Sequence, residues 1–173
     1  IRERGQQVMH KLVAASLGTY FWRVLVFNND GGHTNNLLEL SEAQQNKELD
    51  MIREEVDELQ MAFEGFYMKK QEDGTKVKTA FESVQEKRKH IADAIGDIIY
   101  VTMGTAGKHG MDLPNVLYAI AHSNESKYTD GKLVIKDGKI QKGPNFVEPD
   151  LSFVEEPIDF AKEIEAFRNG KQV

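Results

Sequence analysis

Two short acidic clusters are the residues of this chain best suited to chemistry. Glu54, Glu55 and Glu58 lie in the first cluster, and Asp93 and Asp97 lie in the second, each within a stretch whose apolar residues recur at helical spacing. Carboxylates that meet from two helices supply only oxygen ligands, which favour magnesium or manganese over zinc or copper. The pattern therefore indicates a divalent-metal site between two helices.

The first cluster borders an expected apolar stripe. Positions three or four apart share one face of a helix. By that spacing Glu55 falls at the edge of the stripe, Glu58 lies just beyond it, and Asp57 points almost directly away from the core. Ordinary surface charge is the alternative interpretation, and it fits this cluster better when the cluster is taken alone. The expected stripe consists of Leu49, Ile52, Val56, Leu59, Phe63 and Phe66.

The second cluster lies on a stretch that is apolar in nearly every direction around a helix axis. Such a helix is expected to be buried on most sides. Asp93 and Asp97 are four residues apart, so they project one above the other with little solvent around them. Buried carboxylates are costly unless they are paired or bound to metal. Lys89 lies four residues before Asp93 and can pair with it, whereas Asp97 needs a partner from elsewhere.

Composition narrows the possible functions. The chain has 173 residues, of which 40% are hydrophobic, so we expect one domain with a real core. The net charge of -6 argues against a nucleic-acid partner, since phosphate backbones require clustered lysines and arginines. The absence of cysteine excludes disulfides and zinc ribbons and fits a reducing cytoplasm. Residues 12–27 form the longest apolar run, which Arg23 interrupts, so no membrane span is expected.

Periodicity and caps predict four to five helices and one hairpin. Ser41 is the expected N-cap of the helix with the first acidic cluster, and Asp112 caps a later helix with Pro114 in its first turn. Asp137 and Gly138 form the favoured turn of a tight hairpin. The expected helices cover about residues 5–27, 41–70, 79 or 83 to 109, 114–126 and 157–169, with a connector at 71–77. The single domain divides into 1–36 (first helix and loop), 37–127 (metal-site helices) and 128–173 (hairpin, strap and last helix).

Histidine spacing argues against a di-iron bundle, and magnesium chemistry indicates the kind of substrate. Di-iron bundles use a Glu three residues before a His, and none of the five histidines has one. Magnesium held by a few carboxylates completes its shell with waters and substrate phosphates. It also lowers the pKa of a bound water, which a spare carboxylate can deprotonate. A polyphosphate is therefore the expected substrate.

Four sequence blocks in this order resemble the MazG-like, all-α NTP pyrophosphohydrolase superfamily. The similarity covers about residues 40–151 and is closest to the phosphoribosyl-ATP pyrophosphohydrolase-like branch. The first block alone is weak, whereas the four together are fairly specific. The blocks read EEVDEL at residues 54–59, DAIGDIIYV at 93–101, HSNESK at 122–127, and DGKIQKGPNF at 137–146 followed by PDL at 149–151.

The resemblance implies an all-α protein, a four- to five-helix bundle of the all-α NTP pyrophosphatase type with a small C-terminal β-hairpin. It also implies that a nucleoside triphosphate is hydrolysed between its α and β phosphates to the monophosphate and pyrophosphate. The expected cofactor is Mg²⁺, with Mn²⁺ as a substitute. The expected assembly is a homodimer or homotetramer. Phosphoribosyl-ATP or dUTP is the alternative substrate.

Residue roles carry over from the family pattern. By this resemblance Glu55, Glu58 and Asp97 are metal ligands, and Glu54 is a general base or an outer ligand. Family members commonly carry Glu three residues before the last of these acids, where this chain has Ala94. We expect Asp93 to act as a ligand in its place. A catalytically weak helical interaction protein, with Ala94 marking a decayed site, is the alternative from another class.

The end of the fourth helix carries the expected substrate contacts. The resemblance places Asn124 and Lys127 near the base, sugar or phosphates, and a helix C-cap with a solvated lysine is an equally good interpretation. Lys139 and Lys142 on the hairpin are positioned to cover the phosphates, with solvated hairpin lysines as the safer alternative. We retain Lys142 with Asn124 and Lys127 as the substrate-binding set.

Overall fold

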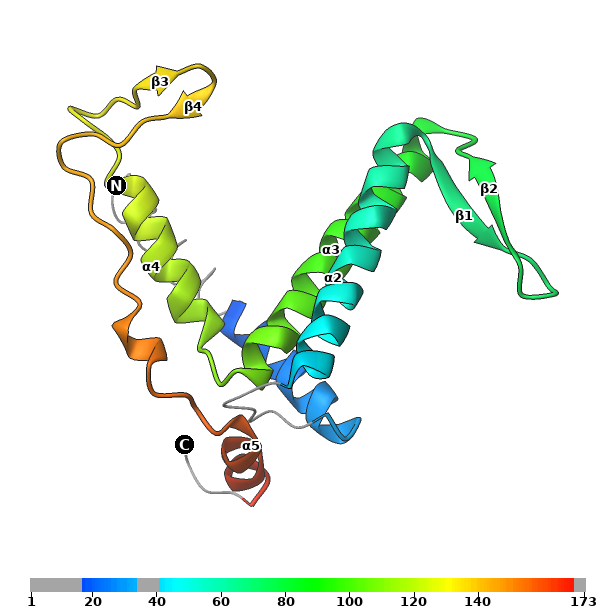
Figure 1. Cartoon of the computed structure of the whole chain (residues 1–173), viewed down its shortest axis with the longest axis horizontal. Coiled ribbons are helices and arrows are strands. Elements are labelled where there is room, and N and C mark those ends of the chain that lie inside the picture. The colour runs from blue at the N-terminus through cyan, green and yellow to red at the C-terminus, as the bar shows by residue number, and fades with distance from the viewer. Residues whose placement is uncertain (1–16, 34–40, 170–173) are drawn as a thin grey trace, which may run out of the picture. The chain divides into compact units, whose positions relative to one another are not determined.

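The computed structural model describes residues 17–33 and 41–169, most of which are helical (Figure 1). They form two compact units, residues 41–105 and residues 17–33 with 106–169, and each is considered by itself. No helix in these ranges is long and apolar enough to cross a membrane. The assignment of residues 1–173 to a single domain stays a prediction.

Helix α2 covers Glu42–Glu64 and begins where the sequence predicts. The hydroxyl of Ser41 accepts a hydrogen bond from the backbone N–H of Gln44, while the Gln44 side-chain oxygen accepts one from the backbone N–H of Ser41. This reciprocal capping box satisfies two backbone donors that a helix start leaves unpaired. The helix ends at Gly65, whose φ of 96° is a left-handed conformation that glycine adopts readily.

The buried side of α2 is rotated from the predicted stripe. Ile52 and Leu59 are half-buried as expected, but the same side also contains Glu55 and the fully buried Ala62. Helix α3 runs antiparallel along α2 and covers only this narrow side (Figure 1). Three residues of the predicted stripe are therefore exposed, namely Leu49, Val56 and Phe63.

A β-hairpin follows α2, and the prediction of a helix to about residue 70 is wrong. Strands β1 (Phe66–Lys70) and β2 (Lys76–Ala80) pair antiparallel. Asp73 closes the turn between them by accepting hydrogen bonds from the backbone N–H and the hydroxyl of Thr75. The segment 71–77, expected to connect two helices, is thus a tight turn between two strands and the start of the second strand.

Helix α3 covers Val84–Lys108 without a break, but it is less buried than predicted. Ala94 and Met103 are buried, whereas Ile95 and Ile99 are exposed. In this unit α3 meets one neighbouring helix and the hairpin end, which cannot cover an apolar surface on every side.

The second unit contains α4 and the predicted hairpin. Helix α4 covers Leu113–Glu125, with Asp112 as N-cap accepting a hydrogen bond from the backbone N–H of Asn115. Strands β3 (Ile135–Lys136) and β4 (Lys139–Ile140) flank a turn in which Asp137 and Gly138 both have positive φ. Both the cap and the Asp-Gly turn are therefore confirmed.

The core of the second unit joins residues 17–30, which are helical, to the C-terminal helix. The first helix was expected from about residue 5, and its predicted start lies outside the described residues. A 3-10 turn (η1, Ser152–Val154) precedes α5 (Phe160–Arg168), which begins after its N-cap Asp159. The rings of Phe21 and Phe160 meet edge to face with centroids 5.6 Å apart, and Leu25 and Ile164 are almost fully buried. The prediction of an all-α fold with a small hairpin is confirmed, and the described residues contain a second hairpin, β1–β2, that was not predicted.

Candidate functional site

Glu55 is the centre of the acidic region between α2 and α3. Burial raises the pKa of the half-buried Glu55 carboxyl, and the negative charges of Glu58, Asp97, Glu54 and Asp93 raise it further. Two of these neighbours lie on α3 and two lie on α2. The structure therefore brings acidic residues of both helices within electrostatic reach of a single side chain.

The two aspartates of α3 are exposed, contrary to prediction. Ala94 is buried and Ile98 is half-buried, each directly after one of the aspartates, so α3 uses the adjacent positions for packing. Asp93 and Asp97 consequently lie on the flank of the helix pair, where solvent lowers the cost of their charge. Glu54 and Glu58 are exposed as well. These carboxylates are open to a ligand in the single chain.

The donor chemistry of this region fits a hard divalent cation. In the described residues no three Asp, Glu or His side chains converge as a ready-made metal site. The groups that raise the pKa of Glu55 are nevertheless all carboxylates, the ligands that Mg²⁺ and Mn²⁺ prefer. A bound cation would offset the repulsion among them.

A further buried carboxylate, Glu48, was missed by the sequence analysis. It is 6% exposed and accepts a hydrogen bond of 2.9 Å from the hydroxyl of Thr105 on α3. It lies seven residues before Glu55 and so on the same side of α2. That spacing is the only sequence signal that could have identified it. Ala94, the departure from the family pattern, is 2% exposed in the interface between the helices.

A cavity of about 540 Å³ opens beside the acidic residues in the same unit. Glu54, Glu58 and Asp93 line it. Asp57 also lines it, although its spacing predicted that it points away from the core. The cavity is bounded on other sides by residues of the hairpin and α3. Tyr67 and Lys76 carry no role predicted from the sequence, and the expectation for His90 was a polar packing residue and not a ligand.

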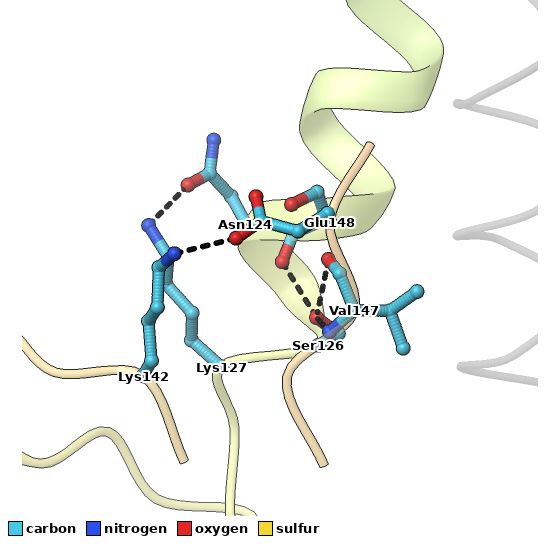
Figure 2. A network of polar contacts seen from close by, with 7 residues as sticks. Asn124, Ser126, Lys127, Lys142, Val147 and Glu148 are labelled. Carbon is cyan, nitrogen blue, oxygen red and sulfur yellow. Dashed lines mark hydrogen bonds and ion pairs between the residues drawn. The ribbon is translucent and has the colours of Figure 1, made fainter. Parts of the chain in front are cut away.

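The three predicted substrate residues meet at the end of α4 (Figure 2). The Lys127 amino group donates a 2.6 Å hydrogen bond to the side-chain oxygen of Asn124, and the Lys142 amino group makes a 2.6 Å ion pair with Glu148. Ser126 is the C-cap, and its hydroxyl accepts a hydrogen bond from the backbone N–H of Val147.

This network connects the SNESK motif (residues 123–127) with the segment that contains the KGPNF motif (residues 142–146). Figure 2 shows Lys127 and Lys142 extended alongside each other toward the end of α4. The Lys142 amino group also lies 4.2 Å from the centre of the Phe146 ring. The helix C-cap is Ser126 and not Asn124, whereas the hydrogen bond of Lys127 lies at the exposed surface, so a solvated lysine and a substrate contact both stay predictions. These residues belong to the second unit, and the acidic residues belong to the first.

Comparison with known proteins gives one family match. The family model described as phosphoribosyl-ATP pyrophosphohydrolase matches residues 31–124, more than half of the chain. The matched range includes the acidic residues of α2 and α3 and ends at Asn124. No curated protein matches the sequence.

Proposed function

Because the chain belongs to the phosphoribosyl-ATP pyrophosphohydrolase family, hydrolases of acid anhydrides within the MazG-like superfamily, we propose that it cleaves nucleotides between the α and β phosphates. The products are the nucleoside monophosphate and pyrophosphate. The observation that carries the proposal is that Glu54 and Glu58 of α2 and Asp93 of α3 line one cavity, beside Glu55, whose pKa the neighbouring negative charges raise. Such a group is suited to a cation that binds phosphate oxygens.

Glu55, Glu58, Asp93 and Asp97 would hold Mg²⁺, or Mn²⁺ in its place. When bound, the metal neutralises phosphate charge and favours ionisation of a coordinated water. Glu54 is the proposed general base, because it is exposed and lines the cavity beside these carboxylates. Its carboxylate takes a proton from the attacking water as the water adds to phosphorus and the bond to the bridging oxygen breaks.

Nucleoside and deoxynucleoside triphosphates are the proposed substrates. The family description itself favours phosphoribosyl-ATP as the second candidate, and dUTP is a third that shares the same bond. Asn124, Lys127 and Lys142 are proposed to contact the substrate, because two amino groups and an amide lie together at the end of α4. Lysine amino groups are effective point charges for phosphate oxygens.

A homodimer or homotetramer is part of the proposal. Exposed apolar side chains lie on both helices of the first unit. Apolar surface of this kind, when contiguous, marks a contact between proteins. Light scattering on the purified chain measures the assembly. The exposed apolar residues include Leu49, Val56 and Phe63 on α2 and Ile95 and Ile99 on α3.

The lack of cysteine supports a reducing, cytoplasmic setting.

A nucleotide panel with separate detection of pyrophosphate and orthophosphate tests the function. We expect magnesium-dependent release of pyrophosphate from at least one substrate, and loss of turnover in Glu58→Gln and Asp97→Asn with unchanged folding. Glu72→Gln is the matched control, since Glu72 lies in the β1–β2 turn, does not line the cavity and is not among the charges that raise the pKa of Glu55. Full activity in both Glu58→Gln and Asp97→Asn would refute the site, and orthophosphate as the first product would refute the reaction.

A further inference from the structure

The cavity beside the acidic residues has an aromatic wall. Tyr67 on β1 and His90 on α3 both line the cavity, and their rings stack on each other with centroids 4.5 Å apart and an angle of 27° between their planes. Phe81, which does not line the cavity, packs against both rings at centroid distances of 5.4 Å and 5.1 Å. The aromatic pair is thus held in place from behind while it remains open to the cavity.

The hairpin also brings positive charge to the cavity. The two strands of the β1–β2 hairpin contain four lysines and no acidic residue. Lys70 lies directly opposite Lys76 in the register, an arrangement that destabilises a hairpin unless negative charge lies nearby. Lys76 lines the cavity.

The two charged walls do not neutralise each other directly. In the part of the chain that the structure describes, no ion pair joins Lys76 to a carboxylate of α2 or α3. Glu58 and Asp93 thus face the cavity with negative charge while Lys76 faces it with positive charge. A ligand that carries both signs, such as a metal–triphosphate complex, would satisfy both walls at once.

We propose that the β1–β2 hairpin forms the nucleotide-recognition side of this cavity. The Tyr67–His90 pair stacks on the base, and Lys76 binds phosphate oxygens that extend toward the carboxylates. The cavity volume of about 540 Å³ lies within the roughly 300–1,000 Å³ usual for small-molecule sites. This inference rests on the proposed function, and it adds the residues that distinguish a nucleotide from a bare polyphosphate.

Base and phosphate contacts have separate signatures in kinetics. With the full chain and Mg²⁺, KM is measured for the best nucleotide of the panel, and Ki is measured for inorganic tripolyphosphate, which has no base. Stacking on an aromatic side chain changes affinity roughly 5- to 150-fold. Tyr67→Leu should therefore raise KM at least fivefold and leave Ki unchanged. Lys76→Ala should raise both constants about tenfold, because a hydrogen bond from a charged amino group to phosphate is partly replaced by one to water.

Two further variants guard against a structural explanation. Lys69→Ala removes a lysine of the same hairpin that does not line the cavity and should change neither constant. Tyr67→Phe keeps the ring, so it should recover most of the affinity that Tyr67→Leu loses. Circular dichroism and melting curves show whether each variant folds. If Tyr67→Leu does not fold, Lys76→Ala and Tyr67→Phe decide the outcome.

Each result has a defined meaning. Wild-type constants in both Lys76→Ala and Tyr67→Leu overturn this inference while the proposed function stands, provided that the wild-type chain releases pyrophosphate. An equal rise of KM and Ki in Tyr67→Leu overturns the base assignment. A wild-type chain that neither binds nor cleaves any nucleotide overturns the proposed function and this inference with it.

Discussion

Replacing Glu55 by Gln should abolish turnover and yet stabilise the metal-free protein. Glu55 and Glu58 are three residues apart on α2, and a like-charged pair at this spacing costs about 0.2–0.5 kcal/mol. The charges of Asp93 and Asp97 also oppose ionisation of Glu55. We therefore expect Glu55→Gln to gain about 0.5–1 kcal/mol at pH 7 and low salt, which corresponds to a Tm about 1–4 °C higher for a chain of this size.

In the presence of magnesium, wild type should have a higher Tm than Glu55→Gln, the reverse of the order expected without metal. A ligand at 100 times its Kd stabilises the folded state by about 2.7 kcal/mol, or about 5–10 °C in Tm for wild type. The variant lacks a proposed metal ligand and should gain much less. Differential scanning fluorimetry in EDTA and in Mg²⁺, beside a pyrophosphate-release assay, measures both effects. Glu72→Gln removes a charge of the same sign from the hairpin turn and should behave as wild type.

Two results would refute this reasoning. A lower Tm for Glu55→Gln in EDTA would mean that the carboxylate is stabilised by its surroundings and is not repelled by neighbouring acids. An unchanged magnesium shift in a variant that retains turnover would remove Glu55 from the metal site. Raising the salt concentration provides an internal check, because screening should reduce the gain of the variant in EDTA.

Three further predictions concern pH, substrate binding and the backbone. The pKa of Glu55 is raised above 4.5, so in the folded protein this carboxyl keeps its proton to a higher pH than in the unfolded chain. As the pH rises from 4.5 through the pKa of the folded protein, wild type should therefore lose stability relative to Glu55→Gln. Melting curves recorded without metal over this pH range measure the difference. Lys142→Ala should raise KM about tenfold if Lys142 makes one phosphate contact. The variant should change Tm little, because the ion pair of Lys142 with Glu148 is exposed. An unchanged KM would exclude a role for Lys142 in substrate binding. Gly110→Ala should cost at least about 1–2 kcal/mol in urea unfolding, since Gly110 has a φ of 64° and a Cβ there would lie 2.7 Å from the carbonyl oxygen of Ile158; a cost near zero would contradict the described backbone.

Features that depend on local chemistry were predictable from the sequence. Ser41 and Asp112 cap helices because their side chains reach backbone N–H groups three residues on. The turn at Asp137 and Gly138 needs two positive φ values that few other residue pairs accept. The acidic residues of α2 and α3 could be expected to meet because a short segment joins two long helices, which then pack antiparallel.

Features that depend on which neighbours are present were not predictable. Phe66 continues the apolar spacing of α2, so only Gly65 signalled that the helix ends and a strand begins. The exposure of Asp97 follows from the number of elements packed around α3, which its own sequence does not reveal. Tyr67 and Lys76 reach the acidic region only because the hairpin exists, so no spacing rule could place them there.

The uncovered apolar side chains of α2 and α3 also bear on how activity scales with abundance. If copies of the chain must associate to shield these residues, stability becomes inseparable from protomer concentration. Turnover per molecule would then decline on dilution, and total output would climb more steeply than in simple proportion as expression increases. A cell could in that case switch this hydrolase on by making more of it, with no separate activator.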